Sequence, residues 1–415
     1  MRSFIFTITA AVFACCAAAA AQTPEAILSG PKAVRALDFI RSVEAETVAE
    51  QIKTCEIPAP PFKEQERAAY YKQRFTELGL RNVRIDREGN VIGERPGTDS
   101  SRTLALVAHL DTVFPEGTDV RVKRQGTVLT GPGIGDNCRG LAVMLAVIRA
   151  LDDARIETGS SIVFVANVGE EGLGNLRGTR HLLTEEMPGR ITEFIGVDAQ
   201  GFDIVEREIG SNRYRVTFSG PGGHSFIDFG RPSAIHALGR AIDKISLLRP
   251  PASPKTTFNV GRIDGGTTVN SIAQTASMEV DLRSVSGAEL AKIDADFKRA
   301  VADALTEENA GRSGGFQLSV DIKLIGERPV GRQAPDAPII RTILAADRAL
   351  GVRSNLTASS TDSGMPNKLG IPAVTIGSGG RWLGSHSVTE SFDMTDSYRG
   401  SQRVLAAVLA IAGAK

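Results

Sequence analysis

The first 200 residues alternate between two kinds of hydrophobic spacing. Apolar side chains recur with helical spacing over 35–53 and 63–79. Residues 140–151 are apolar almost all round, which is typical of a buried helix. Short apolar runs indicate strands buried on both faces at 103–108, 161–168 and 193–199. Alternating helices and buried strands predict an α/β fold built on a largely parallel sheet.

Near residue 212 the pattern changes to strict alternation. Tyr214, Val216 and Phe218 alternate with polar residues, which predicts a strand with one buried face. A helix at 232–247, extended segments at 256–262 and 273–283, a helix at 287–306 and a strand at 316–323 follow. This β-α-β-β-α-β order is ferredoxin-like. The α/β pattern returns with a helix at 337–350, a strand at 371–377 and a helix at 395–412. We therefore predict a domain at 212–324 inserted into an α/β domain made of 22–211 and 325–415.

Composition and charge narrow the possible partners. The 415 residues are 42% hydrophobic and 23% charged, as in an ordinary globular protein. Forty-eight Lys and Arg residues balance 48 Asp and Glu residues. This balance gives no electrostatic reason to expect nucleic acid or an anionic membrane as a partner.

The N-terminus has the pattern of a secretory signal. Arg2 precedes an apolar segment, and the small residues Ala19 to Ala21 stand before Gln22. We expect residues 1–21 to be a signal peptide and the mature protein to be exported, to a periplasm, without membrane insertion. Lipoprotein anchoring at Cys15 or Cys16 and a buried N-terminal helix are the alternatives. Export would permit a disulfide between the two remaining cysteines, Cys55 and Cys138, but the sequence leaves their pairing open.

Three of the five histidines lie in unusual surroundings: His109 in "AHLDT", His224 in "GPGGHSF" and His386 in "GSHSVTE". His181 and His236 fall inside helical patterns, and we expect them to be packing or surface residues. His109 and Asp111 are two residues apart at the end of a strand, so both can face the same way. A ligating imidazole usually donates its other N–H group to a carboxylate, which suits this spacing.

Several carboxylates also follow predicted strands. Glu170 and Glu171 are adjacent in "GEEG", and Asp198 ends "FIGVDA". Asp136 lies in "GPGIGDNCRG", which lacks the G-x-G-x-x-G spacing of a dinucleotide loop, so it is either a helix cap or a ligand. Open α/β sheets bind ligands beyond the carboxyl ends of their strands. Carboxylates and imidazoles gathered there suit a pair of cocatalytic zinc ions.

The order of motifs resembles the glutamate carboxypeptidase and aminoacylase family of zinc hydrolases, which includes aminotripeptidase and acetylornithine deacetylase relatives. The motifs are "HLDT", "GPGIGDN", "GEEG", "GVDAQG", "GPGGHS", "GGTTVNSIA", "VDLRS" and "GSHSVTE". The resemblance implies a zinc-exopeptidase-like three-layer α/β catalytic domain with an inserted ferredoxin-like dimerisation domain, or lid. It also implies a homodimer and two Zn²⁺ ions per subunit, with Co²⁺ or Mn²⁺ as substitutes.

The resemblance assigns roles residue by residue. His109 and Asp198 would bind one zinc ion, Glu171 and His386 the other, and Asp136 would bridge the two. Asp111 would orient His109, and Glu170 would be the general base. In the inserted domain, His224 would help to stabilise the oxyanion across a dimer interface, while Asn270 and Arg283 would hold the substrate.

We therefore expect an exported metallo-exopeptidase or dipeptidase that acts on short peptides. An N-acyl amino acid deacylase that uses the same site is the first alternative, and Arg283, Ser378 and Arg381 are the residues that could discriminate. A non-catalytic metal-binding protein is the alternative from another class. The sequence departs from the family pattern at Asn137-Cys138-Arg139, which makes the Cys138 thiol a candidate extra ligand. Neither Ser225 nor Ser378 lies in a nucleophile elbow, which argues against a serine hydrolase.

Overall fold

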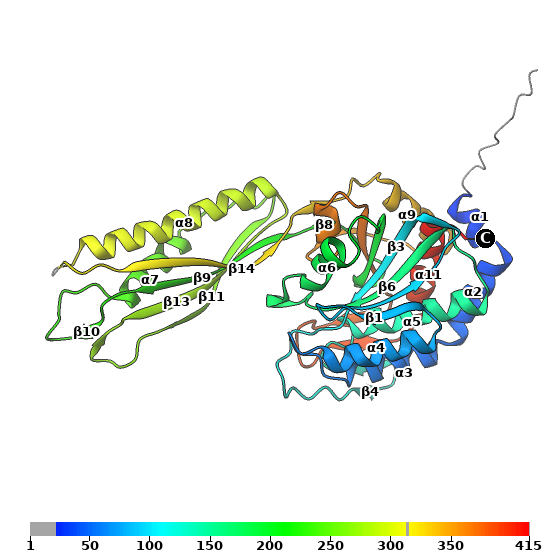
Figure 1. The fold of residues 1–415 in the computed structure, drawn as a ribbon, viewed down its shortest axis with the longest axis horizontal. Coiled ribbons are helices and arrows are strands. Elements are labelled where there is room, and N and C mark those ends of the chain that lie inside the picture. Colours follow the sequence, from blue (N-terminus) through cyan, green and yellow to red (C-terminus); the bar gives the residue numbers. More distant parts are fainter. Residues whose placement is uncertain (1–21, 313–314, 415) are drawn as a thin grey trace, which may run out of the picture.

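The computed structural model describes residues 22–312 and 315–414 and has two lobes, one large and one small (Figure 1). The expected signal peptide, with Cys15 and Cys16, lies outside the described residues. No helix in the described part of the chain has both the length and the apolar composition needed to span a bilayer.

The large lobe is built on a nine-stranded sheet. Its strands in spatial order are β1 (Arg81–Ile85), β2 (Val91–Arg95), β6 (Ser160–Asn167), β3 (Asp99–His109), β7 (Glu193–Ala199), β17 (Ala373–Gly377), β8 (Ile204–Glu208) and β15 (Gly331–Arg332), with β16 (Leu356–Ser359) paired to β8. The central strands β6, β3, β7 and β17 run parallel, while β2 and β8 are antiparallel to their central neighbours. The carboxyl ends of the central strands therefore meet at one edge of the sheet.

Helices cover both faces of this sheet, because its central strands are apolar on both sides. Leu104, Leu106 and Ala108 of β3 pack into the core on one face, whereas Ala105 and Val107 pack into the core on the other. The first face carries α1 (Pro24–Leu28), α2 (Pro31–Ser42), α4 (Gln65–Glu77), α5 (Cys138–Asp153), α9 (Pro338–Ala349) and α11 (Tyr398–Ala412). The second carries α6 (Arg177–His181), the π-helical turn η2 (Leu182–Glu186) and α10 (Gly364–Lys368). The predicted three-layer α/β class is confirmed.

One predicted helix is wrong. The pattern over 35–53 predicts a continuous helix, but the chain forms α2 and then α3 (Glu44–Cys55), with Val43 outside the helical region at φ −101° and ψ 13°. The bend lets α3 pack along α5, while α2 packs on both α5 and α11. Because apolar spacing is helical on both sides of Val43, hydrophobic periodicity does not reveal the break.

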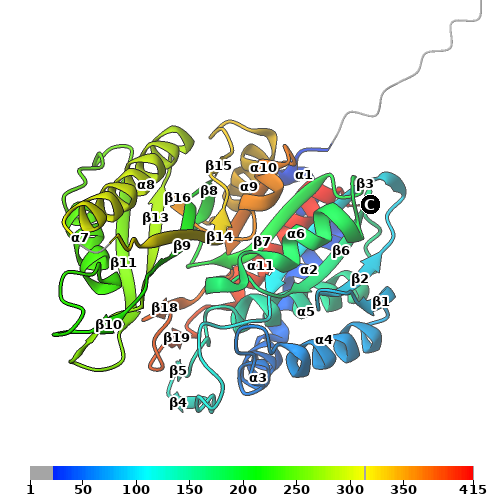
Figure 2. The same cartoon turned by 60° about the vertical axis from the view of Figure 1, so that its left-hand side comes forward.

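The small lobe is a two-layer α+β unit. Its elements are β9 (Gly210–Ser219), α7 (Ala234–Ser246), β11 (Thr256–Gly265), β13 (Thr275–Ser284), α8 (Gly287–Ala310) and β14 (Ser319–Arg328). The strands form an antiparallel sheet in the order β11-β13-β9-β14, which is the ferredoxin-like order. Val216, Met278 and Val280 lie on the face that packs against α7 and α8. Strands β9 and β14 connect this lobe to the large one (Figure 2).

Two smaller sheets position loops that matter for function. Strands β10 (Gly223–His224) and β12 (Ser271–Ile272) pair at the end of the small lobe that points away from the large lobe (Figure 1). The other sheet has the order β18-β19-β5-β4 and comprises β4 (Lys123–Gln125), β5 (Val128–Thr130), β18 (Arg381–Leu383) and β19 (Ser391–Asp393). The loop between β18 and β19 carries His386.

Candidate active site

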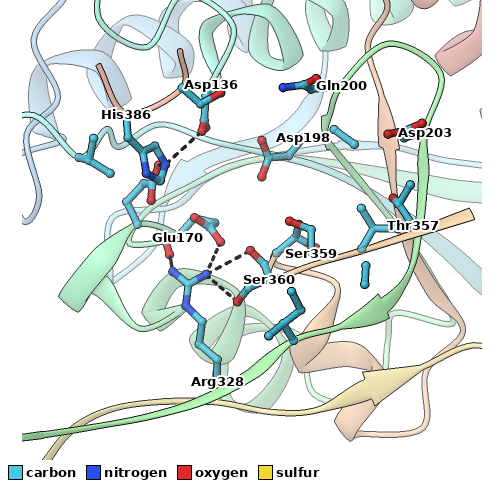
Figure 3. Close-up of a pocket in the computed structure, with 18 of the residues that line it drawn as sticks. Asp136, Glu170, Asp198, Gln200, Asp203, Arg328, Thr357, Ser359, Ser360 and His386 are labelled. Atoms are coloured by element: carbon cyan, nitrogen blue, oxygen red, sulfur yellow. Dashed lines mark hydrogen bonds and ion pairs between the residues drawn. The ribbon is translucent and has the colours of Figure 1, made fainter. Parts of the chain in front are cut away.

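A cleft of about 730 Å³ lies beyond the carboxyl ends of the central strands and reaches the junction with the small lobe. His109 ends β3, Asp198 lies near the end of β7, and Glu170 and Glu171 follow β6. Asp136 precedes α5, and His386 comes from the β18–β19 loop. Figure 3 shows Asp136, Asp198, Glu170 and His386 around the cleft.

One group of potential ligands forms around His109. Its Nε2 atom lies 3.1 Å from Oδ1 of Asp136 and 3.7 Å from Oδ1 of Asp198. Its Nδ1 atom lies 2.9 Å from the main-chain carbonyl oxygen of Asp111 and 3.7 Å from that residue's carboxylate. The Nδ1–H group can therefore donate to the carbonyl, so that in the neutral ring the Nε2 lone pair is available to a metal ion bound between it and the two carboxylates.

A second group forms around His386. Its Nε2 atom lies 3.1 Å from Oε1 of Glu171 and 3.4 Å from Oδ2 of Asp136. Asp136 thus directs one carboxylate oxygen to each histidine. His109 is fully buried, whereas 56% of the His386 side chain is exposed. The two groups therefore differ in their access to solvent.

Asp136 is free for this role because a neighbour caps the helix. The side-chain oxygen of Asn137 accepts a hydrogen bond from the Gly140 amide at 3.1 Å and caps α5. Glu390 supports the same loop, since its Oε1 atom accepts hydrogen bonds from the amides of Gly135 (2.7 Å) and Asp136 (2.9 Å). The motif "GSHSVTE" contains Glu390, but nothing in its local sequence indicates this contact across the fold.

The ionisation of these groups reflects burial and mutual charge. Burial raises the pKa of Asp198 well above its usual value, and burial raises the pKa of Glu171 to about 7 despite the nearby His386. Burial acts the same way on Asp136, but hydrogen bonds from His109 and His386 outweigh it and hold the pKa of Asp136 low. Contacts with Asp136 and Glu171 raise the pKa of His386 to about 10. Without a cation the cluster retains protons, which a bound metal would displace.

The donor set fits a pair of divalent ions. His109, Asp136 and Asp198 each offer a ligand atom within 4.8 Å of the others, and so do Asp136, Glu171 and His386. Imidazole nitrogens and carboxylate oxygens are the donors that zinc prefers outside thiolate sites. Because Asp136 belongs to both groups, its carboxylate can bridge two ions.

Glu170 and Glu171 diverge because their loop holds them in opposite directions. The carboxylate of Asp111 accepts hydrogen bonds from both of their amides, at 3.1 Å and 2.8 Å. Gly169, at φ +70°, allows the turn, and a Cβ atom there would lie 2.5 Å from the Arg177 side chain. Glu171 then faces His386. Glu170 faces Arg328 (Figure 3).

Arg328 is a site residue that the sequence reasoning missed. Its Nη1 atom donates to Oε1 of Glu170 at 2.8 Å and to Oγ of Ser360 at 3.1 Å, and its Nη2 group donates to the Glu170 carbonyl. Arg328 ends β14, so the last strand of the small lobe brings this charge to the rim of the large lobe. No local motif marks it.

Asp362 is a second missed residue, and it lies beneath the same loop. Its carboxylate accepts hydrogen bonds from Asn167 Nδ2 (2.7 Å) and Thr179 Oγ1 (2.5 Å). Burial and repulsion from Glu170 raise the pKa of Asp362 to about 6. Asp362 therefore ties the end of β6 to α6 without contacting the cleft.

The remaining expected site residues fall into two sets. Arg283 lines the cleft beside Arg213, and its Nε atom also lies 2.5 Å from Oδ2 of Asp281. His224 and Asn270 lie at the β10–β12 end of the small lobe and do not line the cleft of their own chain. His224 Nδ1 accepts hydrogen bonds from the amides of Phe226 (3.2 Å) and Ile227 (3.3 Å), which leaves Nε2 to carry the proton of a neutral ring.

Other residues considered from the sequence lie elsewhere. Ser378 and Arg381 do not line the cleft. Cys138 belongs to neither ligand group, and Cys55 and Cys138 are free cysteines buried in one apolar cluster with Trp382. His236 is exposed on α7, and His181 is buried behind the Glu170 loop.

Comparisons with known proteins agree with this geometry. The model of peptidase family M20/M25/M40 matches residues 105–410. The Bacillus subtilis (strain 168) protein YqjE is 25% identical over 387 residues, which cover 88% of this chain and 98% of that protein.

Solved structures share the fold across both lobes. Aminopeptidase PepT from Bacillus cereus superposes with a TM-score of 0.70 at 23% identity and covers 89% of this chain and 99% of its own. The Bacillus subtilis protein YXEP, a dinuclear metal binding peptidase, gives a TM-score of 0.65 at 16% identity and covers 90% and 99%. The family match spans most of the chain and includes every ligand candidate in the cleft. The chain therefore belongs to peptidase family M20/M25/M40 and is a metal-dependent hydrolase.

Proposed function

We propose that this protein is an exported dizinc exopeptidase or dipeptidase that hydrolyses amide bonds in short peptides. The observation that carries the proposal is the position of Asp136 between two sets of imidazole and carboxylate ligands, with the carboxylate of Glu170 beside them. Two ions at such a site supply an activated water and polarise the scissile carbonyl group.

The chain's own residues would divide the remaining work. The Glu170 carboxylate takes a proton from the attacking water and delivers it to the leaving amine. Arg328 holds the side chain of Glu170, and the Asp111 carboxylate holds its main-chain amide. Arg213 and Arg283 line the cleft on the small-lobe side, where a guanidinium can bind a substrate carboxylate in a bidentate manner.

We infer that the active form is a homodimer. His224 and Asn270 lie outside the cleft of their own chain, next to apolar side chains that face solvent. Phe226, Ile227, Phe229 and Val269 are 86%, 78%, 84% and 103% exposed. Four such residues close together favour a buried interface over a solvated surface. In the dimer, the tip of one small lobe would bring His224 and Asn270 to the cleft of the partner.

Metal content is the first test of this function. Elemental mass spectrometry on the purified mature protein should find about two zinc ions per chain, as a cocatalytic pair requires. Well below one equivalent after metal-replete purification would contradict the dizinc site and favour the non-catalytic reading. Two equivalents of cobalt or manganese in place of zinc would support the same pair of binding sites but would identify a different native metal.

A substrate panel tests the reaction. Dipeptides, tripeptides and N-acyl amino acids should be compared by kcat/KM, with peptides blocked at either end. Faster hydrolysis of free short peptides supports the peptidase, whereas preference for N-acyl amino acids supports the deacylase that would use the same residues.

Cell fractionation with N-terminal sequencing tests export, since cleavage before Gln22 is expected.

A further inference from the structure

A second cluster of potential metal ligands lies behind the catalytic loop, outside the cleft. Asp86 lies in the turn between β1 and β2, His181 is the last residue of α6, and Glu186 is the last residue of η2. Each offers a ligand atom within 4.8 Å of the others. None of the three lines the active-site cleft. We propose that this cluster binds one divalent transition-metal ion, zinc in the first instance, as a structural site.

His181 is the observation that distinguishes this cluster from an ordinary acidic patch. Only 8% of its side chain is exposed, and its Nε2 atom is buried without a hydrogen-bond partner. That nitrogen lies 3.9 Å from Oδ2 of Asp86, whose side chain is fully buried. A buried polar atom without a partner is costly, and a metal bond would satisfy it.

The other ring nitrogen of His181 lies beside a carboxylate, as is usual for a ligating histidine. Nδ1 lies 3.5 Å from Oε2 of Glu185, which Arg87 also contacts at 2.6 Å. A carboxylate beside Nδ1 favours the tautomer with the proton on Nδ1, in which the lone pair of Nε2 is available to bind a metal ion. His181 therefore stands between a supporting carboxylate on one side and two ligand carboxylates on the other.

The unusual helical turn explains why His181 and Glu186 meet. In an α-helix of 3.6 residues per turn, residues five apart point about 140° away from each other. Residues 182–186 instead form a π-helical turn, in which the Met187 amide donates to the Leu182 carbonyl at 2.8 Å. The wider turn brings residues five apart closer to one face, and such turns occur frequently at functional sites.

Main-chain hydrogen bonds fix the position of the Asp86 carboxylate in the cluster. Its Oδ1 atom accepts hydrogen bonds from the amides of Glu88, Gly89 and Asn90, all at 2.9 Å, which fixes the carboxylate in the turn. The guanidinium of Arg84 lies 2.7 Å from Glu186. Arg84 also contacts Glu94 at 3.0 Å, and Arg190 contacts the other oxygen of Glu94 at 3.2 Å. Four carboxylates (Asp86, Glu94, Glu185 and Glu186) thus face three guanidinium groups, and the one negative charge in excess favours a further cation.

The cluster is connected to the catalytic loop through Asn90. Asn90 Nδ2 donates to Oδ2 of Asp86 at 2.7 Å and to the Gly178 carbonyl at 2.9 Å, while its Oδ1 atom accepts from the Val168 amide at 3.1 Å. Val168 stands two residues before Glu170. An ion at Asp86 and His181 would therefore fasten the β1–β2 turn to the helix that follows the catalytic glutamates.

Zinc binding to the intact protein tests the proposal. In equilibrium dialysis against zinc, wild type should bind about one ion more than His181→Gln, the stoichiometry of a mononuclear site. His236→Gln is the control, because His236 is also a helical histidine near a carboxylate, 3.7 Å from Glu308, but belongs to no group of potential metal ligands among the described residues. Equal zinc content in wild type and in a folded His181→Gln protein would overturn the site.

A second measurement needs no variant. In a zinc-soaked crystal of wild type, anomalous scattering should place a peak about 2.1 Å from His181 Nε2, a normal zinc–nitrogen distance. Peaks in the cleft report on the proposed active-site ions separately, so the two proposals can fail independently. A water molecule, or no density, between His181 and Asp86 in a zinc-soaked crystal would overturn the structural site.

Discussion

Nη1 of Arg328 lies 2.8 Å from Oε1 of Glu170, although the two residues are 158 positions apart in the chain. Their side chains are 6% and 5% exposed, so the pair is buried. Arg328 comes from the strand that returns from the small lobe, and Glu170 from the rim of the large lobe. The orientation of Glu170, the proposed general base, is thus tied to the connection between the lobes.

This relationship predicts that Arg328→Met is both unstable and impaired. Removing one partner of a buried ion pair leaves the other charge uncompensated and costs about 3–5 kcal/mol. Urea unfolding should show this loss, and kcat should fall because Glu170 and its loop lose their contacts. Arg328→Lys keeps the charge and should retain more stability than Arg328→Met. Equal stability of both variants and wild type would contradict the pair's importance.

Glu170→Gln should remain folded and keep the metal ions while losing activity, although it also lowers stability because the buried Arg328 charge loses its carboxylate partner. General acid–base transfer contributes ~10²–10⁴-fold, and an amide cannot accept the proton. The neighbouring variant Glu171→Gln is the matched control, because it should also lower metal content. Measuring metal content by elemental analysis together with kcat distinguishes the loss of the base from the loss of a metal ligand. Near wild-type turnover in Glu170→Gln would remove Glu170 from the role of base.

The two proposed metal positions should release their ions at different rates. His386 is 56% exposed in its side chain, whereas His109 is fully buried. A chelator should therefore remove the ion on the His386 side first, and a chromophoric chelator should record two phases. In His386→Ala the fast phase should disappear and one ion should remain. A single phase that releases both ions would show that exposure does not govern release.

Glu208 should make stability depend on pH near neutrality. Burial raises the pKa of Glu208 to about 7, although Thr361 and Ser363 donate hydrogen bonds to it. Because its folded pKa lies above the unfolded value, its contribution is complete at low pH and is lost as pH rises from about 4.3 through 7.

The expected difference is on the order of 3 kcal/mol, since each pKa unit corresponds to about 1.4 kcal/mol. Urea unfolding at pH 5 and pH 8 should therefore show a larger pH effect in wild type than in Glu208→Gln. Glu206→Gln is the control on the same strand, because the carboxylate of Glu206 pairs with Arg207 at 2.7 Å. The same pH effect in wild type and Glu208→Gln would contradict the assignment to Glu208.

The proposed dimer predicts complementation between two inactive variants. In Glu170→Gln the base is lost but His224 is intact, and in His224→Ala the reverse holds. A mixed dimer with two-fold symmetry would contain one complete site, so subunit exchange should restore about a quarter of wild-type activity. Light scattering should show dimers before and after exchange. No recovery from mixed dimers, or full activity of His224→Ala alone, would contradict a site shared between subunits.

The sequence by itself determined the order of elements and the residues at strand ends. Apolar runs such as 103–108 and 161–168 indicate buried strands because burial on both faces leaves no polar alternation. Local pattern also placed His109, Glu170, Glu171 and Asp198 at the ends of those strands. Parallel strands bring their carboxyl ends together, so one rim could be expected from the order alone.

The tertiary structure alone decided the contacts between segments far apart in the chain. The pairing of Arg328 with Glu170, the support of Asp136 by Glu390 and the approach of Asp86 to His181 depend on how strands and helices pack. Periodicity reports how buried a residue is, but it does not report which residue lies opposite. His181 illustrates this limit, because its helical surroundings predict packing, and only the fold reveals a buried nitrogen facing a carboxylate.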